Sequence, residues 1–229
     1  MTYTDFLASL EKLKNLFGIV PEFIAFQNLE IGISIDTGNI IPIDFLKDEV
    51  IDYKITQKNI DTHYGKGYTV SFKLNNYIVK LYDKSMQCAL PNNVLRFEIR
   101  VKKMVHIKKA EIKTLNDLIE KKKWEWLINL LLETFKDVII CKYDPYAELS
   151  LDENNFILNG YNQQFWLRNW TKSEDYKDGS KDVEYKKRRK AYFKMRGCFI
   201  KLISQHEFDR NKILFLCKIK DGLANLMTS

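Results

Sequence analysis

Two glutamates in this 229-residue chain stand in separate stretches that alternate between polar and apolar residues. Glu30 belongs to NLEIGISI, and Glu98 belongs to LRFEIRV. Alternation with a period of two is typical of a β-strand, because every second side chain points to the same face of a sheet. If the two strands are neighbours with their apolar faces covered, we expect both carboxylates to share one open polar surface.

Basic side chains accompany these glutamates. The stretch YIVKLYDK places Lys80, Tyr82 and Lys84 on its polar side. Lysine and arginine can hold a phosphate group, and two carboxylates supply the hard oxygen ligands that suit Mg²⁺ or Mn²⁺. The pattern is therefore compatible with metal-assisted phosphoryl transfer, with Lys80, Arg96 and Arg100 contacting the nucleic acid. From the alternation alone, cross-strand salt bridges that pair Glu98 with Lys80 or Lys84 are the slightly better explanation.

The elements that must position these residues indicate an α+β fold. Strands are expected at residues 23–36, 67–74, 77–83 and 95–101, and helices at residues 4–17 and from Thr114 to about 140. Thr114 and Asp117 have the spacing of a capping box. We expect an antiparallel sheet with helices packed on one face over residues 1–143, followed by a basic helical extension over residues 144–229.

Positive charge is concentrated in two blocks of the chain. The net charge is +7 overall, with +7 in residues 61–110 and +8 in residues 161–229, whereas the other two segments are acidic. Segregated positive charge favours a nucleic-acid partner. The run YKKRRKAYFKMR predicts a helix that contacts phosphates, although a solvated helix face explains it equally well. Its candidate contact residues are Lys186, Lys187, Arg188, Arg189 and Lys190.

Several classes of protein do not fit the composition. No apolar window is long enough to span a membrane, and the N-terminal stretch is expected to be a helix rather than an export signal. The four cysteines have no C-x-x-C spacing, which favours reduced thiols in a cytoplasmic protein. The three histidines lie far apart, so a zinc site is not expected.

The order of NLEIGISI, YIVKLYDK, LRFEIRVKKM and TLNDL resembles the rolling-circle replication initiators of plasmids and filamentous phages, including the Rep_trans-type plasmid proteins. The resemblance covers about residues 23–120. It implies that the protein nicks one DNA strand at an origin to start replication, with single-stranded or origin DNA as its partner. In such proteins a tyrosine attacks a phosphodiester with the help of a divalent metal, Mg²⁺ or Mn²⁺, and leaves a 5′-phosphotyrosyl link and a free 3′-OH.

The resemblance also implies roles for individual residues. Glu30 and Glu98 correspond to the acidic metal-site residues, and Lys84 to a cation beside the phosphate. The tyrosine nucleophile falls nearest Tyr68, with Tyr77 as the second choice.

The chain departs from this family in two ways within the matched region. It has no His-hydrophobic-His motif, and its first acidic strand has one carboxylate, Glu30, where the plasmid proteins often have two, unless Asp36 serves. An alternative is therefore a non-catalytic nucleic-acid-binding protein that uses the same basic surfaces. A further alternative is an accessory protein whose basic face meets an acidic partner. DNA or RNA preference, origin sequence and oligomeric state stay open.

Overall fold

The computed structural model describes residues 3–54, 56, 58–63, 67–167 and 181–228. The strands are β1 (Leu29–Asp36), β2 (Val50–Tyr53), β3 (Lys58–His63), β4 (Gly67–Lys73), β5 (Tyr77–Asp83), β6 (Val94–Val101) and β7 (Val138–Ile140). The helices are α1 (Tyr3–Phe17), α2 (Pro42–Asp44), α3 (Lys84–Cys88), α4 (Lys121–Asp137), α5 (Leu151–Gly160), α6 (Gln163–Leu167), α7 (Lys181–Gln205) and α8 (Arg210–Thr228). The short 3₁₀ or π turns are η1 (Pro21–Phe23), η2 (Phe45–Glu49), η3 (Met104–Ala110) and η4 (Leu115–Ile119).

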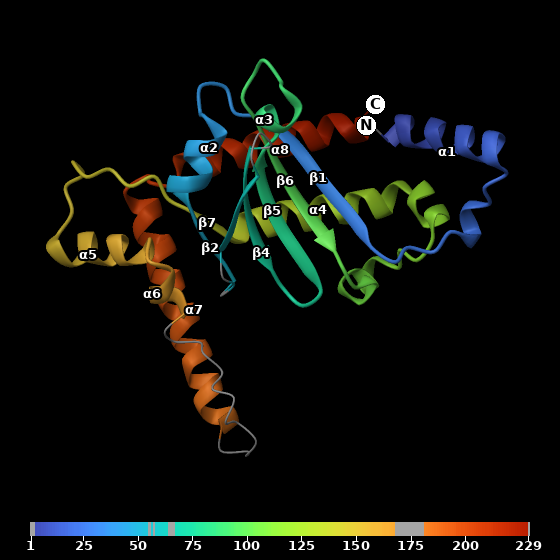
Figure 1. The fold of residues 1–229 in the computed structure, drawn as a ribbon. Helices are drawn as coiled ribbons and strands as arrows, with labels where there is room; N and C mark the ends of the chain where they lie inside the picture. The colour runs from blue at the N-terminus through green and yellow to red at the C-terminus, as the bar shows by residue number, and fades with distance from the viewer. Residues whose placement is uncertain (1–2, 55, 57, 64–66, 168–180, 229) are drawn as a thin grey trace.

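An antiparallel sheet of five strands, in the order β1-β6-β5-β4-β3, forms the centre of the molecule. Figure 1 shows α4 and α8 crossing behind this sheet, and both helices contribute to the core on that side. The other face is turned toward the viewer and carries the polar side chains of the strands. The expected α+β fold, with helices on one face of an antiparallel sheet, is confirmed.

The apolar face of the sheet is buried because it consists of the alternate residues of each strand. Leu95, Phe97 and Ile99 of β6 have no exposed surface. The ring of Phe97 meets that of Phe135 from α4 edge to face, with 5.0 Å between the ring centres. Such aromatic pairs contribute about 0.5–1.5 kcal/mol beyond the burial of their area. The pairing of the strands is therefore fixed by the same side chains that form the core.

A two-stranded ribbon, β2 with β7, lies between this core and a second one. Val50 and Ile140 of the ribbon pack into the core of the large sheet, whereas Ile51 and Ile139 pack into the second core. The second core also contains side chains of α5, α6 and α7. Helices α5 and α7 approach so closely that a Cβ at Gly160 would lie 2.1 Å from the Phe199 ring.

The C-terminal end of α4 is held by cations from both C-terminal helices. Arg196 of α7 donates to the carbonyl oxygen of Asp137 at 2.5 Å, and Lys212 of α8 donates to that of Lys136 at 2.6 Å. Carbonyl groups in the last turn of a helix have no partner within the helix, and cations are favourable there. These contacts fix α7 and α8 against the sheet. Helix α8 enters the core of the sheet through Phe215 and Ile219, so part of residues 144–229 packs with the sheet.

Several sequence-based expectations need adjustment. Residues 138–140 form strand β7, so the helix expected to reach residue 140 ends at Asp137. The capping box of Thr114 and Asp117 is present, but it begins the short turn η4 rather than α4. Strands β2 and β3 were not predicted. Residues 151–160, expected partly as a connection, form helix α5, which begins with a capping box at Ser150.

We predict that Tyr192→Phe destabilises the protein measurably. The Tyr192 hydroxyl of α7 donates to the carboxylate of Asp52 in β2 at 2.9 Å, and both residues are buried. Loss of this donor should lower the free energy of unfolding by about 1–3 kcal/mol, as measured by urea denaturation.

The matched control for this substitution is Tyr146→Phe. The Tyr146 side chain is 93% exposed, so its change should stay within about 0.5 kcal/mol. Equal stability of the two variants would contradict a stabilising role for the bond between α7 and β2.

Candidate functional site

The polar face of the five-stranded sheet is built from cross-strand rows of side chains. We use this name for the face that carries Glu30, Glu98, Lys80, Arg96, Arg100 and Tyr82. The register gives one row across all five strands, Gly32–Glu98–Lys80–Ser71–Asn59. A parallel row is Ser34–Arg96–Tyr82–Thr69–Asp61. On the side of the first row that faces away from the second, Glu30 of β1 pairs with Arg100 of β6.

The structure brings Glu30 and Glu98 together through one lysine. The ammonium nitrogen of Lys80 lies 3.1 Å from Oε1 of Glu30 and 2.9 Å from Oε1 of Glu98. Arg100 lies 3.4 Å from Glu30, and Arg96 lies 3.8 Å from Glu98. The predicted nucleic-acid residues of the sheet therefore form one connected network of ion pairs.

Lys84 lies at the edge of this network rather than in it. Lys80 and Lys84 were the two lysines expected to pair with Glu98, and in the structure Lys80 forms this ion pair. The Lys84 ammonium donates to Oε1 of Gln87 at 3.0 Å and lies 5.8 Å from the centre of the Tyr82 ring. Lys84 is the first residue of α3, so the strand has already ended at this position.

Gly32 provides the space in which the Arg96 side chain lies. A Cβ at Gly32 would lie 2.7 Å from the carbonyl oxygen of Phe97 and 3.1 Å from two nitrogens of the Arg96 guanidinium. The guanidinium therefore extends across β1, where it also donates to the hydroxyl of Ser34 at 3.3 Å. A glycine inside a strand is typical of such a close approach, and this signal was readable in NLEIGISI.

Burial and hydrogen bonding act in opposite directions on Lys80. Partial burial alone lowers the pKa of the Lys80 ammonium, but the hydrogen bonds to Glu98 and Glu30 outweigh it, and the net pKa is above its ordinary value. Burial also raises the pKa of Tyr82, and the neighbouring Glu98 carboxylate adds to the effect. At neutral pH the network therefore contains a charged lysine and a protonated tyrosine, whose hydroxyl donates to Oε2 of Glu98 at 3.3 Å.

The residues around Glu30 and Glu98 do not fit the divalent metal that the resemblance implies. The Lys80 ammonium lies between the two carboxylates, where a cation would have to bind. Among the residues that the structure describes, no group of three or more His, Cys, Asp or Glu side chains is arranged to hold a metal ion. The donor set is thus two carboxylates already neutralised by a lysine and two arginines.

The two tyrosines predicted as nucleophiles lie on the opposite, apolar face of the sheet. Tyr68 and Tyr77 are both buried, with 5% and 8% of their surfaces exposed. The hydroxyl of Tyr77 is hydrogen-bonded to that of Tyr53 at 2.9 Å, and its ring stacks on His106 with 4.0 Å between centres. Burial raises the pKa of both Tyr68 and Tyr77. The structure does not bring either one to the acidic pair, whereas Tyr82 contacts Glu98 directly.

Helix α7 presents the predicted basic run on its outer surface. Lys186, Lys187, Arg189 and Lys190 are exposed and Arg188 is half-buried. The Arg189 guanidinium lies 5.6 Å from the centre of the exposed ring of Phe193, which is one turn further along the helix. Figure 1 shows α7 extending away from the five-stranded sheet on the side of the β2–β7 ribbon. The basic run and the polar face are therefore two separate surfaces.

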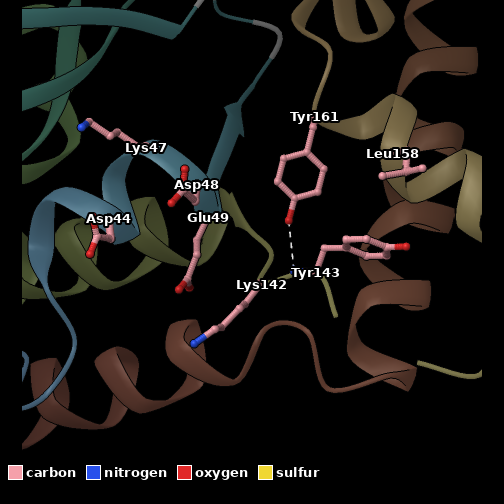
Figure 2. Close-up of a pocket in the computed structure, with 8 residues that line it drawn as sticks. All are labelled: Asp44, Lys47, Asp48, Glu49, Lys142, Tyr143, Leu158 and Tyr161. Carbon is pink, nitrogen blue, oxygen red and sulfur yellow. Dashed lines mark hydrogen bonds between the residues drawn. The ribbon is translucent and has the colours of Figure 1, made fainter. Parts of the chain in front are cut away.

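A cleft of about 550 Å³ lies between η2, the residues after β7 and the end of α5. Figure 2 shows its side chains, including Glu49 and Lys142, which are directed toward one another, and Tyr161, whose hydroxyl accepts from the backbone N–H of Tyr143. The carboxylate of Glu49 is buried and accepts two hydrogen bonds from Asn211 of α8. Because the lining residues come from three separate segments, no pattern in the sequence indicated the cleft.

Comparisons with known proteins give no relative: no protein-family model, no curated protein and no solved structure matches this chain. None of the described helices has the length and apolar character needed to cross a membrane.

We predict that Glu49→Gln stabilises the protein increasingly as the pH rises. Burial raises the pKa of Glu49, and the hydrogen bonds from Asn211 offset this only in part. The folded wild type therefore binds this proton more tightly than the unfolded chain, and the corresponding stability is lost as the pH rises through the raised pKa. The difference in free energy of unfolding between variant and wild type should grow between about pH 4 and pH 7.

Urea denaturation across this pH range measures the difference. Glu148→Gln, at an exposed position, is the control and should show no such trend. A difference for Glu49→Gln that is constant with pH would contradict a buried, charged carboxylate at the α8 contact.

Proposed function

We propose that this chain is a cytoplasmic nucleic-acid-binding protein that contacts phosphates with the exposed cations of α7 and of the polar face, in the replication of a plasmid or phage. The observation that carries the proposal is the outer surface of α7. From Tyr185 to His206 the chain has no carboxylate. The same stretch has eight cations, of which six are exposed: Lys186, Lys187, Arg189, Lys190, Lys194 and Lys201. Arg188 is half-buried, and Arg196 contacts the end of α4.

The inner side of α7 explains why its cations can act together. Tyr192, Phe199 and Ile203 are buried in the second core, and Arg196 is held at the end of α4. The helix is therefore anchored from Tyr192 to Ile203, and the basic run from Lys186 to Lys190 lies just before this anchored part in the same helix. Phosphate contacts of this kind position a nucleic acid without reading its sequence.

The polar face supports the proposal with a different arrangement of charge. Lys80, Arg96 and Arg100 are held in place by two carboxylates, so the network keeps one net positive charge. Arginine and lysine fixed in this way can accept a phosphate without losing side-chain freedom on binding. Single-stranded DNA is the partner that the resemblance to replication initiators implies, and positively charged surfaces are typical of proteins that bind it.

We predict that Lys187→Gln, Arg189→Gln and Lys190→Gln together weaken binding of a single-stranded oligonucleotide and reduce its salt dependence. Each phosphate contact that is lost removes about 0.7 from the slope of log affinity against log salt, so the triple variant should lose about 2. Fluorescence anisotropy at several salt concentrations measures the slope.

The control removes the same charge elsewhere. Lys12, Lys14 and Lys122 are exposed on α1 and α4, away from the basic run. Their replacement by glutamine should leave the slope nearly unchanged. If both triple variants reduce the slope equally, binding follows net charge rather than α7, and the proposal is wrong.

A second candidate function is strand nicking, and the position of Tyr82 favours it. This hydroxyl lies on the polar face beside Glu98 and near the Arg96 guanidinium. A tyrosine oxygen at this position could form a bond to phosphorus while the bond from phosphorus to the 3′ oxygen breaks. The phenol proton would pass to Glu98, and the leaving 3′ oxygen would take a proton from solvent. Tyr68 and Tyr77 could reach a phosphate only if the core of the sheet opened.

We predict that, if the protein nicks DNA, the covalent adduct depends on Tyr82. The protein is incubated with single-stranded DNA and Mn²⁺, and adducts are detected by denaturing gel electrophoresis. Tyr82→Phe should abolish the adduct, whereas Tyr68→Phe and Tyr77→Phe should retain it. Absence of any adduct in the wild type would leave the non-catalytic function as the proposal.

A further inference from the structure

The ammonium of Lys80 occupies the space between the two carboxylates of the polar face. Glu30, Glu98 and Lys80 come from three adjacent strands, β1, β6 and β5, so the lysine reaches across β6 to contact both acids. Its side chain is 24% exposed and that of Glu98 is 10% exposed. The contact is thus partly shielded from water, where ion pairs are stronger than at an open surface.

A divalent cation and this ammonium group cannot both occupy the position. Mg²⁺ needs carboxylate oxygens at about 2.0–2.1 Å, and an ion that bridged the two Oε1 atoms would lie in the space that Lys80 occupies. The nitrogen-to-oxygen distances of 2.9 and 3.1 Å are those of charge-assisted hydrogen bonds. The lysine therefore supplies the positive charge that a metal would otherwise supply.

The network can still accept an anion. An ammonium group has three N–H donors, and the two carboxylates take two of them. With Arg96 and Arg100 the network contains three cations against two carboxylates. One net positive charge on a solvent-facing surface suits one phosphodiester group of a nucleic-acid backbone.

We propose that Lys80 takes the place of a divalent cation between Glu30 and Glu98, so that the polar face binds a phosphate group of a nucleic acid without a metal. The phosphate part of this inference rests on the proposed function. The replacement of a metal by Lys80 is independent of it and is tested in the absence of nucleic acid.

The first experiment titrates Mn²⁺ into the protein alone and follows the electron paramagnetic resonance signal of the free ion. Wild type should bind no Mn²⁺ at this pair. Lys80→Met keeps most of the length of the side chain but removes its charge, so it should gain a Mn²⁺ site. The added substitution Glu98→Gln should abolish that site. Lys73→Met, at an exposed position on the same face outside the ion-pair network, is the control and should gain none.

The second experiment measures binding of a single-stranded oligonucleotide by anisotropy with EDTA and with Mn²⁺. The affinity of the wild type should be the same in both. Lys80→Met should bind about tenfold more weakly in EDTA, the loss expected for one charge-assisted contact, while circular dichroism shows it folded.

Two results would overturn the inference. One is a Mn²⁺ site in the wild type that Glu98→Gln abolishes, since the lysine would then not exclude the metal. The other is a folded Lys80→Met protein that gains no Mn²⁺ site. If the wild type binds no oligonucleotide at all, the proposed function and the phosphate part of the inference fail, and the Mn²⁺ titration still decides the role of Lys80.

Discussion

Burial of one face of the five-stranded sheet beneath α4 and α8 is the constraint on which the rest of the structure depends. Because side chains alternate along each strand, covering Leu95, Phe97 and Ile99 forces Arg96, Glu98 and Arg100 to the other face. A shift of one residue in the register would bury the charges and expose the core. The same alternation places Tyr68 and Tyr77 on the buried face, away from Glu30 and Glu98. It places Tyr82 on the polar face, beside Glu98. The fold thus decides which side chains can act together.

Strands β1, β4, β5 and β6 and the shared face of the two glutamates could be predicted because the alternation is local. The position of each tyrosine was also readable: Tyr68 has the same parity as Val70 and Phe72, and Tyr77 the same as Val79 and Leu81. The family resemblance, which rests on spacing along the chain, pointed to them in spite of this parity. The placement of Lys80 between two carboxylates needed the register of three strands, which depends on the order β1-β6-β5. No pattern in the sequence indicates that strand order.

The parts that could not be predicted are those held by contacts between distant segments. Strands β2 and β7 are short, and each residue of the ribbon is buried on one side or the other, so neither shows the polar alternation of an exposed strand. Their apolar residues fit a helix or a strand equally well, and the pairing of Val50 with Ile140 decides between them. The contacts of Arg196 and Lys212 at the end of α4 are likewise invisible until the helices are placed.

The two cationic surfaces differ in how their charge is balanced, and this difference bears on what each can contribute. On the polar face, Glu30 and Glu98 neutralise most of the charge and fix Lys80, Arg96 and Arg100 in position. On α7 the stretch from Tyr185 to Gln205 holds eight cations and no carboxylate, so this part of the helix has the larger excess of positive charge and suits a polyanion. Affinity and its dependence on salt should therefore come mainly from α7, because they follow the number of phosphates neutralised. The sheet is better suited to holding one phosphate group in a defined place, since its cations are already ordered before the nucleic acid arrives.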